Sequence, residues 1–173
     1  MTSERFRQAI ERFDAANAGD PHRELVDGVL EPKELVYARR MTDRLQCFCP
    51  EAPEAVFLAA RCQHIRRWTR PRADYPAGRE GYRRWRTELG QFHAMTAAVI
   101  LGDVGYDSTT IDRVEALLRK ERLKADPETQ LLEDIICLVF VEHYLADFAP
   151  KREEEQLVGV LRKTWRKMSE PGR

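Results

Sequence analysis

A run of apolar residues framed by charged side chains restricts what this chain can fold into. Residues 135–141 are all apolar and would cover the whole circumference of a helix, and a helix that is apolar on every side lies deep in a core. Glu133 and Asp134 precede the run, and Glu142 and His143 follow it. An unpaired buried carboxylate is very costly, so we expect these groups to find a cation, a hydrogen-bond donor or a metal ion. The segment therefore predicts a polar or metal site inside a helical domain.

Helical spacing of apolar residues recurs along the chain, and we find no convincing strand and no internal repeat. The 173 residues suffice for one domain with its own core, and no Gly/Ser-rich linker divides them. We expect an all-α fold, a single compact bundle of about seven helices over residues 1–173, with residues 169–173 as a frayed tail. The helices are expected near residues 3–18, 32–45, 54–68, 80–101, 108–118, 126–145 and 151–168.

Composition points to a soluble helical protein, with 43% apolar and 34% charged residues. No apolar run approaches the roughly 20 residues that cross a bilayer, and the N-terminus lacks the pattern of a secretory signal. The four cysteines do not resemble a disulfide framework. These features predict a cytoplasmic protein that does not associate with membranes.

Positive charge is concentrated in one segment. Residues 61–86 contain nine arginines against Asp74 and Glu80, whereas the whole chain has a formal net charge of zero. A net charge of zero argues against nonspecific nucleic-acid binding, but a local arginine cluster suits a phosphate group. The candidate phosphate-binding residues are Arg66, Arg67, Arg70 and Arg72. The alternative is that the cluster is a solvated face paired with the acidic remainder of the chain.

Two histidines and two carboxylates could form one site. His64, His93 and the pair Glu133-Asp134 lie on three separate expected helices, and imidazole and carboxylate ligands suit Zn, Mn or Fe. His64, His93 and Asp134 would hold the metal, and Glu133 would bind it or act as general base. A core histidine is nevertheless more often hydrogen-bonded than metal-bound, and one of the carboxylates could instead pair with Arg61 or Arg66.

The whole chain resembles an uncharacterised family of bacterial and fungal proteins, catalogued as domain of unknown function 4202. Some members are labelled glutamyl-tRNA synthetase, and residues 167–169 match half of a synthetase signature, but no nucleotide-binding α/β pattern precedes them. The segments that carry the family resemblance are PKELVYARRM (32–41), AARCQHIRRWTRPRADYP (59–76), GYRRWRTELGQFHA (81–94), LLEDIICLVFVE (131–142) and TWRKMS (164–169).

A weaker resemblance is to the HD superfamily of metal-dependent phosphohydrolases. Residues 58–65 resemble the helix that carries the His-Asp pair, with His64 as the histidine, and Asp134 resembles the late aspartate. The sequence departs from that pattern in two ways. Ile65 replaces the aspartate of the pair, and residues 39–40 are arginines where the first histidine is expected. The resemblance implies an HD-like bundle whose metal site is altered.

The leading hypothesis is a metal-dependent hydrolase, an HD-like phosphohydrolase acting on a small phosphorylated molecule or nucleotide with Mn, Fe or Zn. The alternative is a non-enzymatic helical module that binds an anion, a nucleotide or RNA through the arginine-rich loop. A third interpretation is a helical interaction protein, which could form a homodimer through one of its amphipathic faces.

Overall fold

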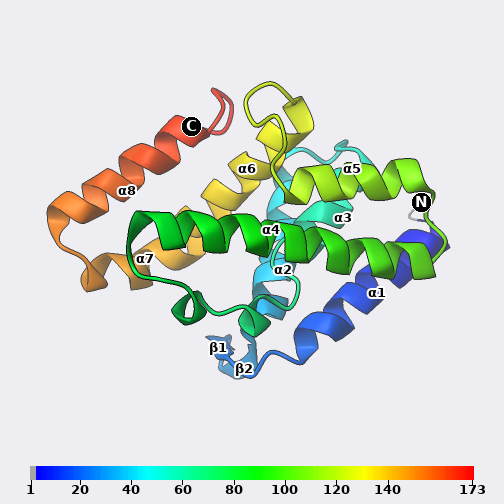
Figure 1. Ribbon diagram of the computed structural model, residues 1–173, viewed down its shortest axis with the longest axis horizontal. Coiled ribbons are helices and arrows are strands. Elements are labelled where there is room, and N and C mark those ends of the chain that lie inside the picture. The colour runs from blue at the N-terminus through cyan, green and yellow to red at the C-terminus, as the bar shows by residue number, and fades with distance from the viewer. Residues whose placement is uncertain (1–2) are drawn as a thin grey trace.

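The computed structural model describes residues 3–173, and these form a compact, mostly helical domain with 71% helix. Figure 1 shows α4 lying across the front of the molecule, with a small two-stranded hairpin at the bottom and α8 at the side away from the N-terminus. The elements are α1 (Glu4–Ala18), β1 (Arg23–Val26), β2 (Val29–Pro32), α2 (Lys33–Phe48), α3 (Glu54–Cys62), α4 (Gly78–Asp103), α5 (Ser108–Leu118), α6 (Pro127–Val139), α7 (Leu145–Phe148) and α8 (Glu154–Lys167). The prediction of one helical bundle is thus confirmed, with one additional short helix.

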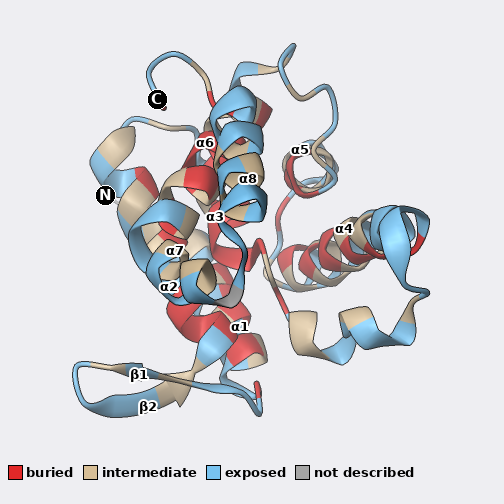
Figure 2. Ribbon diagram, turned by 90° about the vertical axis from the view of Figure 1, so that its left-hand side faces the viewer, coloured by how far each residue is buried: buried red, intermediate tan, exposed pale blue. Residues whose placement is uncertain are grey.

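The short helix α3 lies at the centre of the packing, where it contacts α1, α2, α5 and α6. Val56, Leu58, Ala59 and Ala60 are fully buried, and the small alanines let neighbouring helices approach closely. The core continues along the inward faces of α1, α2, α4 and α6, which are the buried parts in Figure 2. This position explains why residues 55–60 of α3 are all apolar.

Capping residues determine where several helices begin. The Ser3 hydroxyl accepts a hydrogen bond from the Phe6 N–H at the start of α1, and the Asp126 carboxylate accepts one from the Thr129 N–H ahead of Pro127 in α6. Both caps satisfy backbone donors that have no partner within the helix. At the start of α5 the Asp107 carboxylate accepts a hydrogen bond from the Thr110 N–H.

Helix α3 ends at Cys62 rather than continuing to Trp68 as expected. Arg66 adopts a left-handed backbone conformation with φ 51°, which is rare for a residue with a side chain and cannot continue an α-helix. Its N–H donates to the Asn17 side-chain oxygen at 3.0 Å, so the buried Asn17 on α1 anchors the turn. The early end of the helix creates a turn at residues 63–66 in which His64 and the Ile65 carbonyl face other elements.

The hairpin contradicts the expectation that the chain contains no strand. Strands β1 and β2 pair antiparallel, with Val26 opposite Val29. Asp27 and Gly28 between them both have positive φ, 48° and 84°, which is the conformation of a two-residue type I′ turn. The Asp-Gly pair flanked by apolar residues is the sequence signal for this hairpin, although we expected no strand in the chain.

The long apolar segment does not form one regular helix. A π-helix at Phe140–Tyr144 follows α6, and α7 continues it. The wider turn changes which side chains face inward, and such bulges are frequent at functional sites. Here it places Phe140 and Tyr144 on the wall of a cavity.

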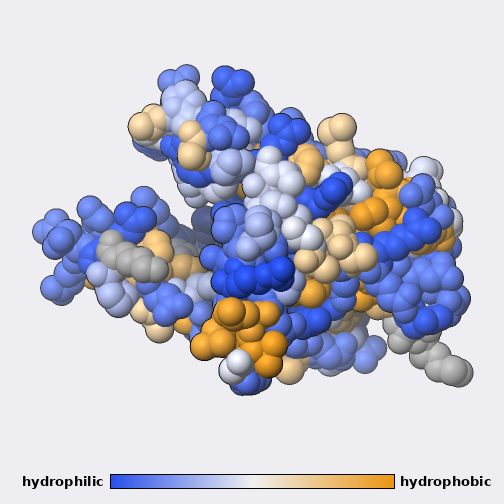
Figure 3. Space-filling view, turned by 90° about the horizontal axis from the view of Figure 1, so that it is seen from below, coloured by the Kyte–Doolittle hydropathy of each residue, from blue (hydrophilic) through white to orange (hydrophobic). Residues whose placement is uncertain are grey.

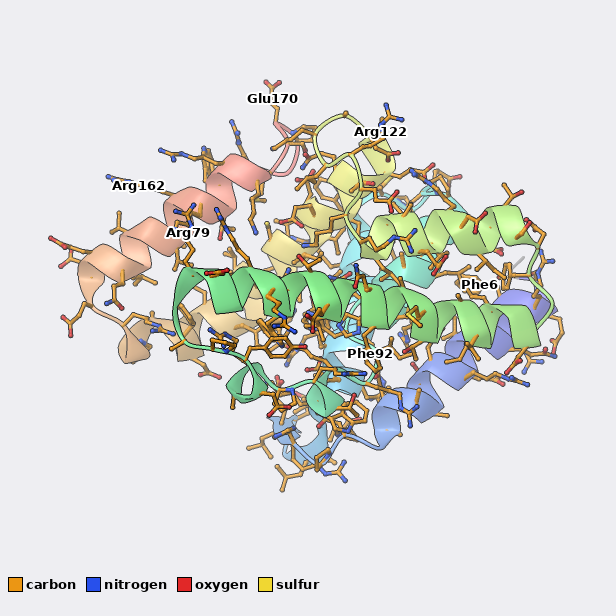
Figure 4. The ribbon with its side chains drawn as sticks, in the orientation of Figure 1. Phe6, Arg79, Phe92, Arg122, Arg162 and Glu170 are labelled. Carbon is orange, nitrogen blue, oxygen red and sulfur yellow. The ribbon has the colours of Figure 1, made fainter. Side chains whose placement is uncertain are left out.

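The segment after α8 packs against α6 rather than remaining free, contrary to the expected frayed tail. Ser169 donates from its N–H to Asp134 Oδ1 at 2.8 Å and from its hydroxyl to Oδ2, and Gly172 is buried. Glu170 projects away from the body of the molecule (Figure 4). None of the helices in residues 3–173 has the length and apolarity of a membrane span.

Candidate functional site

Two cavities meet around His64. The larger has a volume of about 580 Å³ and is lined from α2, the turn after α3, α4, α6, the π-helix, α7 and α8. The smaller, of about 250 Å³, lies between that turn, α4 and the segment after α5. Both cavities share Gln63, His64, Arg86 and Lys120 in their walls. The size of the larger cavity is typical of small-molecule sites.

Basic side chains outnumber carboxylates in the larger cavity. Glu34 and Glu133 are its acidic residues, and its basic residues are Lys33, Arg67, Arg86, Lys120 and Lys167. Lys120 and Lys167 both form ion pairs with Glu133. Within residues 3–173, Lys33 and Arg86 form no ion pair with a carboxylate. The cavity therefore has an excess of positive charge, and a concave surface concentrates that field.

His64 is held on three sides. Its ring stacks on Tyr37, with ring centres 4.0 Å apart, and its Nδ1 lies 3.1 Å from Glu34 Oε2. Arg67 donates to Nε2 at 2.8 Å. An arginine donates only, so Nε2 must accept and the neutral ring carries its proton on Nδ1, where it can donate to Glu34. His64 is thus a neutral link between a carboxylate and a guanidinium.

The charge states of this group follow from burial and from the nearby cations. Burial lowers the pKa of His64 well below its usual value, and Arg67, Arg86 and Lys120 lower it further. Burial also raises the pKa of Glu34 to about 7, although Arg67 opposes that shift. His64 therefore stays neutral at physiological pH, while Glu34 is the carboxyl group that changes charge there.

His93 lies next to His64, with ring centres 6.1 Å apart. Its Nδ1 donates to the Ile65 carbonyl at 2.9 Å, so the turn after α3 fixes the orientation of the ring. Burial lowers the pKa of His93 to about 3. The ring is therefore neutral, and its Nε2 is a buried acceptor without a hydrogen-bond partner among the described residues.

Glu133 belongs to the cavity wall, but it is not a free base. It contacts Lys120 Nζ and lies 3.2 Å from Lys167 Nζ. Burial alone would raise its pKa, and the two lysines outweigh burial, so the pKa of Glu133 is lowered. The carboxylate remains ionised and joins α6 to α8 and to the segment after α5. The expectation that Glu133 finds a cation is satisfied by lysines rather than by Arg61 or Arg66.

Asp134 lies on a different side of α6. Its carboxylate accepts hydrogen bonds from the Ser169 N–H and hydroxyl and from the Gln130 amide at 2.8 Å, and it lines neither cavity. The reason is helical geometry, because adjacent residues of a helix point about 100° apart. Asp134 holds the C-terminal segment in place through its hydrogen bonds to Ser169, while its neighbour Glu133 faces the cavity.

The proposed metal ligands are therefore not brought together. The structure places His64 and His93 side by side and directs Asp134 elsewhere, and residues 3–173 contain no group of three His, Cys, Asp or Glu side chains that could hold a metal ion. The expected ligand set of His64, His93 and Asp134 is therefore not assembled among the described residues. The two histidines are instead satisfied, wholly or in part, by hydrogen bonds within the protein.

The four arginines expected to bind phosphate separate in the structure. Arg67 alone faces the larger cavity. Arg66 is exposed at the turn, and Arg70 is exposed with its guanidinium 5.1 Å from the centre of the Phe92 ring on α4. Arg72 donates to the backbone carbonyls of Tyr75 and Pro76, at 2.9 and 2.8 Å, so it holds its own loop together.

Several residues that line the site were not among the candidates from sequence. Arg86 was within the arginine cluster but was not singled out, and it lies in the third turn of α4, where it lines both cavities. Lys33, Lys120 and Lys167 come from three other parts of the chain, at the start of α2, after α5 and at the end of α8. No local pattern marks them, since their only common feature is the cavity that they line.

The fold and the site define this chain as a helical domain with a basic cavity. The family described as "Domain of unknown function (DUF4202)" matches residues 7–173, and the chain belongs to that family. No curated protein and no solved structure matches the chain significantly.

Proposed function

We propose that this protein binds a small phosphorylated molecule in the cavity around His64. The observation that carries the proposal is the surplus of cations over carboxylates in a cavity of about 580 Å³. Arg67 and Arg86 can each present several N–H donors to phosphate oxygens, and Lys33 adds a point charge at the start of α2. Phosphate is the common ligand group that carries enough charge and acceptors to match them.

The remaining wall supports an organic ligand rather than a bare anion. Aromatic rings alternate with the basic groups in the larger cavity, from Tyr37, Tyr82, Phe140, Tyr144 and Phe148. Such rings favour a planar or apolar part of a ligand. The combination of a basic region and an aromatic wall is consistent with a nucleotide or another phosphate ester.

Metal-dependent hydrolysis by an HD-like site has less support than binding. Its expected ligands are not grouped, and its expected base Glu133 is engaged by two lysines. RNA binding through the loop at residues 70–79 also has less support, because Arg72 donates its hydrogen bonds to backbone carbonyls of that loop. The positive surplus lies in a concave cavity of about 580 Å³, which suits a small molecule better than an extended nucleic-acid strand.

The test is calorimetric titration of the protein with inorganic phosphate. Arg86→Gln removes one cavity cation, and Arg83→Gln, on the same helix but exposed and outside both cavity walls, is the matched control. We expect Arg86→Gln to weaken phosphate binding roughly tenfold to a hundredfold, because a hydrogen bond to a charged group is lost. Arg83→Gln should bind as the wild type does. Absence of binding, or equal loss in both variants, would refute the proposal.

A further inference from the structure

The smaller cavity contains two buried hydrogen-bond acceptors that nothing in the described protein satisfies. His93 Nε2 and Gln63 Oε1 have no partner among residues 3–173. The two residues are only 4% and 5% exposed, and both line this cavity. A buried polar atom without a partner costs free energy. Two of them in one cavity wall indicate a place where a ligand donates.

The acceptor role of His93 is fixed by the fold. Its other ring nitrogen, Nδ1, donates to the Ile65 carbonyl, so the single proton of the neutral ring is already committed. The turn after α3 determines this arrangement, because the helix ends early and leaves the Ile65 carbonyl free to accept. Nε2 can therefore receive a hydrogen bond from a ligand but cannot give one.

Hydrogen-bond donors also line the smaller cavity. Arg86 and Lys120 line both cavities, so a ligand placed where the cavities meet would face two cations and two acceptors. An inorganic phosphate dianion satisfies the cations but carries a single proton, which cannot serve both His93 and Gln63. A phosphate ester that also carries hydroxyl groups satisfies both sets.

On this basis we propose that the ligand is a hydroxyl-bearing phosphate ester, of the sugar phosphate class, and that His93 and Gln63 recognise its hydroxyl groups while Arg86 and Lys120 bind its phosphate. The inference rests on the proposed function and adds the chemical class of the ligand to it. His93 and Gln63 would then set specificity, because they distinguish an ester with several hydroxyl donors from a phosphate dianion with one.

The experiment compares ribose 5-phosphate with inorganic phosphate as calorimetric probes. In the wild type we expect ribose 5-phosphate to bind at least about tenfold more tightly, because two otherwise unsatisfied acceptors gain donors. His93→Asn keeps an N–H near the position of Nδ1 for the Ile65 carbonyl but removes the Nε2 acceptor, and Gln63→Leu removes the other acceptor at similar size. Each variant should lose most of the preference for ribose 5-phosphate and retain the affinity for inorganic phosphate.

The retained affinity for inorganic phosphate also shows that each variant is folded. Equal binding of the two probes to the wild type would overturn this inference and leave the phosphate site standing. An unchanged preference in both variants would overturn the assignment to His93 and Gln63. If neither probe binds, the proposed function itself fails.

Discussion

Protonation of the Glu34 side chain changes the net charge of the cavity near neutral pH. Burial raises its pKa to about 7, and the carboxyl lies among Asp20, Lys33, Arg67, His64 and His93. Below that pH the group is neutral and the positive surplus around it grows. Above that pH the carboxylate offsets part of the charge of Arg67. Anion binding should therefore depend on pH through this one residue.

We expect the affinity for sulfate, an anion whose charge is constant over this range, to rise about tenfold between pH 8 and pH 6. Protonation of Glu34 removes a negative charge from the cavity wall, while the pKa values of His64 and His93 lie too low for either ring to titrate in this window. Glu34→Gln should bind sulfate with nearly constant affinity across the same range. A wild-type slope that persists in this variant would assign the pH dependence to another group. Titration calorimetry at fixed ionic strength is the appropriate measurement.

Some residue roles were predictable from sequence because they depend on near neighbours. The caps at Ser3 and Asp126 are examples, since each contacts a backbone N–H three residues along. The sequence predicted that Glu133 would pair with a cation, but not which residues would provide it. Lys120 and Lys167 are 13 and 34 positions away, and only the folded chain brings them to one carboxylate.

At the scale of elements, backbone conformation determines where the site groups point. Arg66 and Lys120 both have positive φ, 51° and 56°, which costs free energy for residues other than glycine. Arg66 closes the turn that follows α3, beside His64. Lys120 turns the chain after α5, where it lines the cavity. Neither residue type predicts such a conformation, so the early end of α3 could not be derived from sequence. The Asp-Gly turn of the hairpin could have been.

The N-terminal end of α4 depends on Gly81. A Cβ atom at this position would lie 2.0 Å from the Pro76 carbonyl oxygen, so the preceding loop packs directly on the helix backbone. We expect Gly81→Ala to lower the free energy of unfolding by at least about 2 kcal/mol, since the loop must move. Gly102→Ala, on the same helix with open space around it, should be neutral or stabilise by about 0.5–1 kcal/mol. Urea unfolding measures both, and equal effects would contradict the close approach at Gly81.

At the scale of the whole molecule, the cavity joins segments from both ends of the chain. Lys33 at the start of α2 and Lys167 at the end of α8 line the same wall. Helical periodicity predicted most of the helices, because they depend on local apolar spacing. It could not predict which charged faces converge, so a metal triad was expected where the structure has a basic cavity.

Figure 3 shows an apolar patch on the underside, where the hairpin exposes Leu25, Val29 and Leu30.

Helix α8 is the element that a ligand should stabilise most. None of its residues with described burial is buried, and its main contact is with α6. It nevertheless supplies Val160, Thr164 and Lys167 to the larger cavity. A helix held mainly at one surface opens locally more often than the core does, and a ligand that binds only the closed form suppresses this opening in proportion to its occupancy.

We therefore expect backbone amides of α8 to exchange hydrogen faster than those of α3 in the free protein. Inorganic phosphate at about ten times its dissociation constant should slow exchange in α8 about tenfold, and exchange in α3 should change less. Hydrogen exchange followed by mass spectrometry gives both rates. Arg86→Gln should remove the protection at the same phosphate concentration, whereas Arg83→Gln should retain it. If phosphate binds by calorimetry but leaves α8 exchange unchanged, the ligand does not reach the wall that α8 supplies, and the phosphate then lies in the smaller cavity alone.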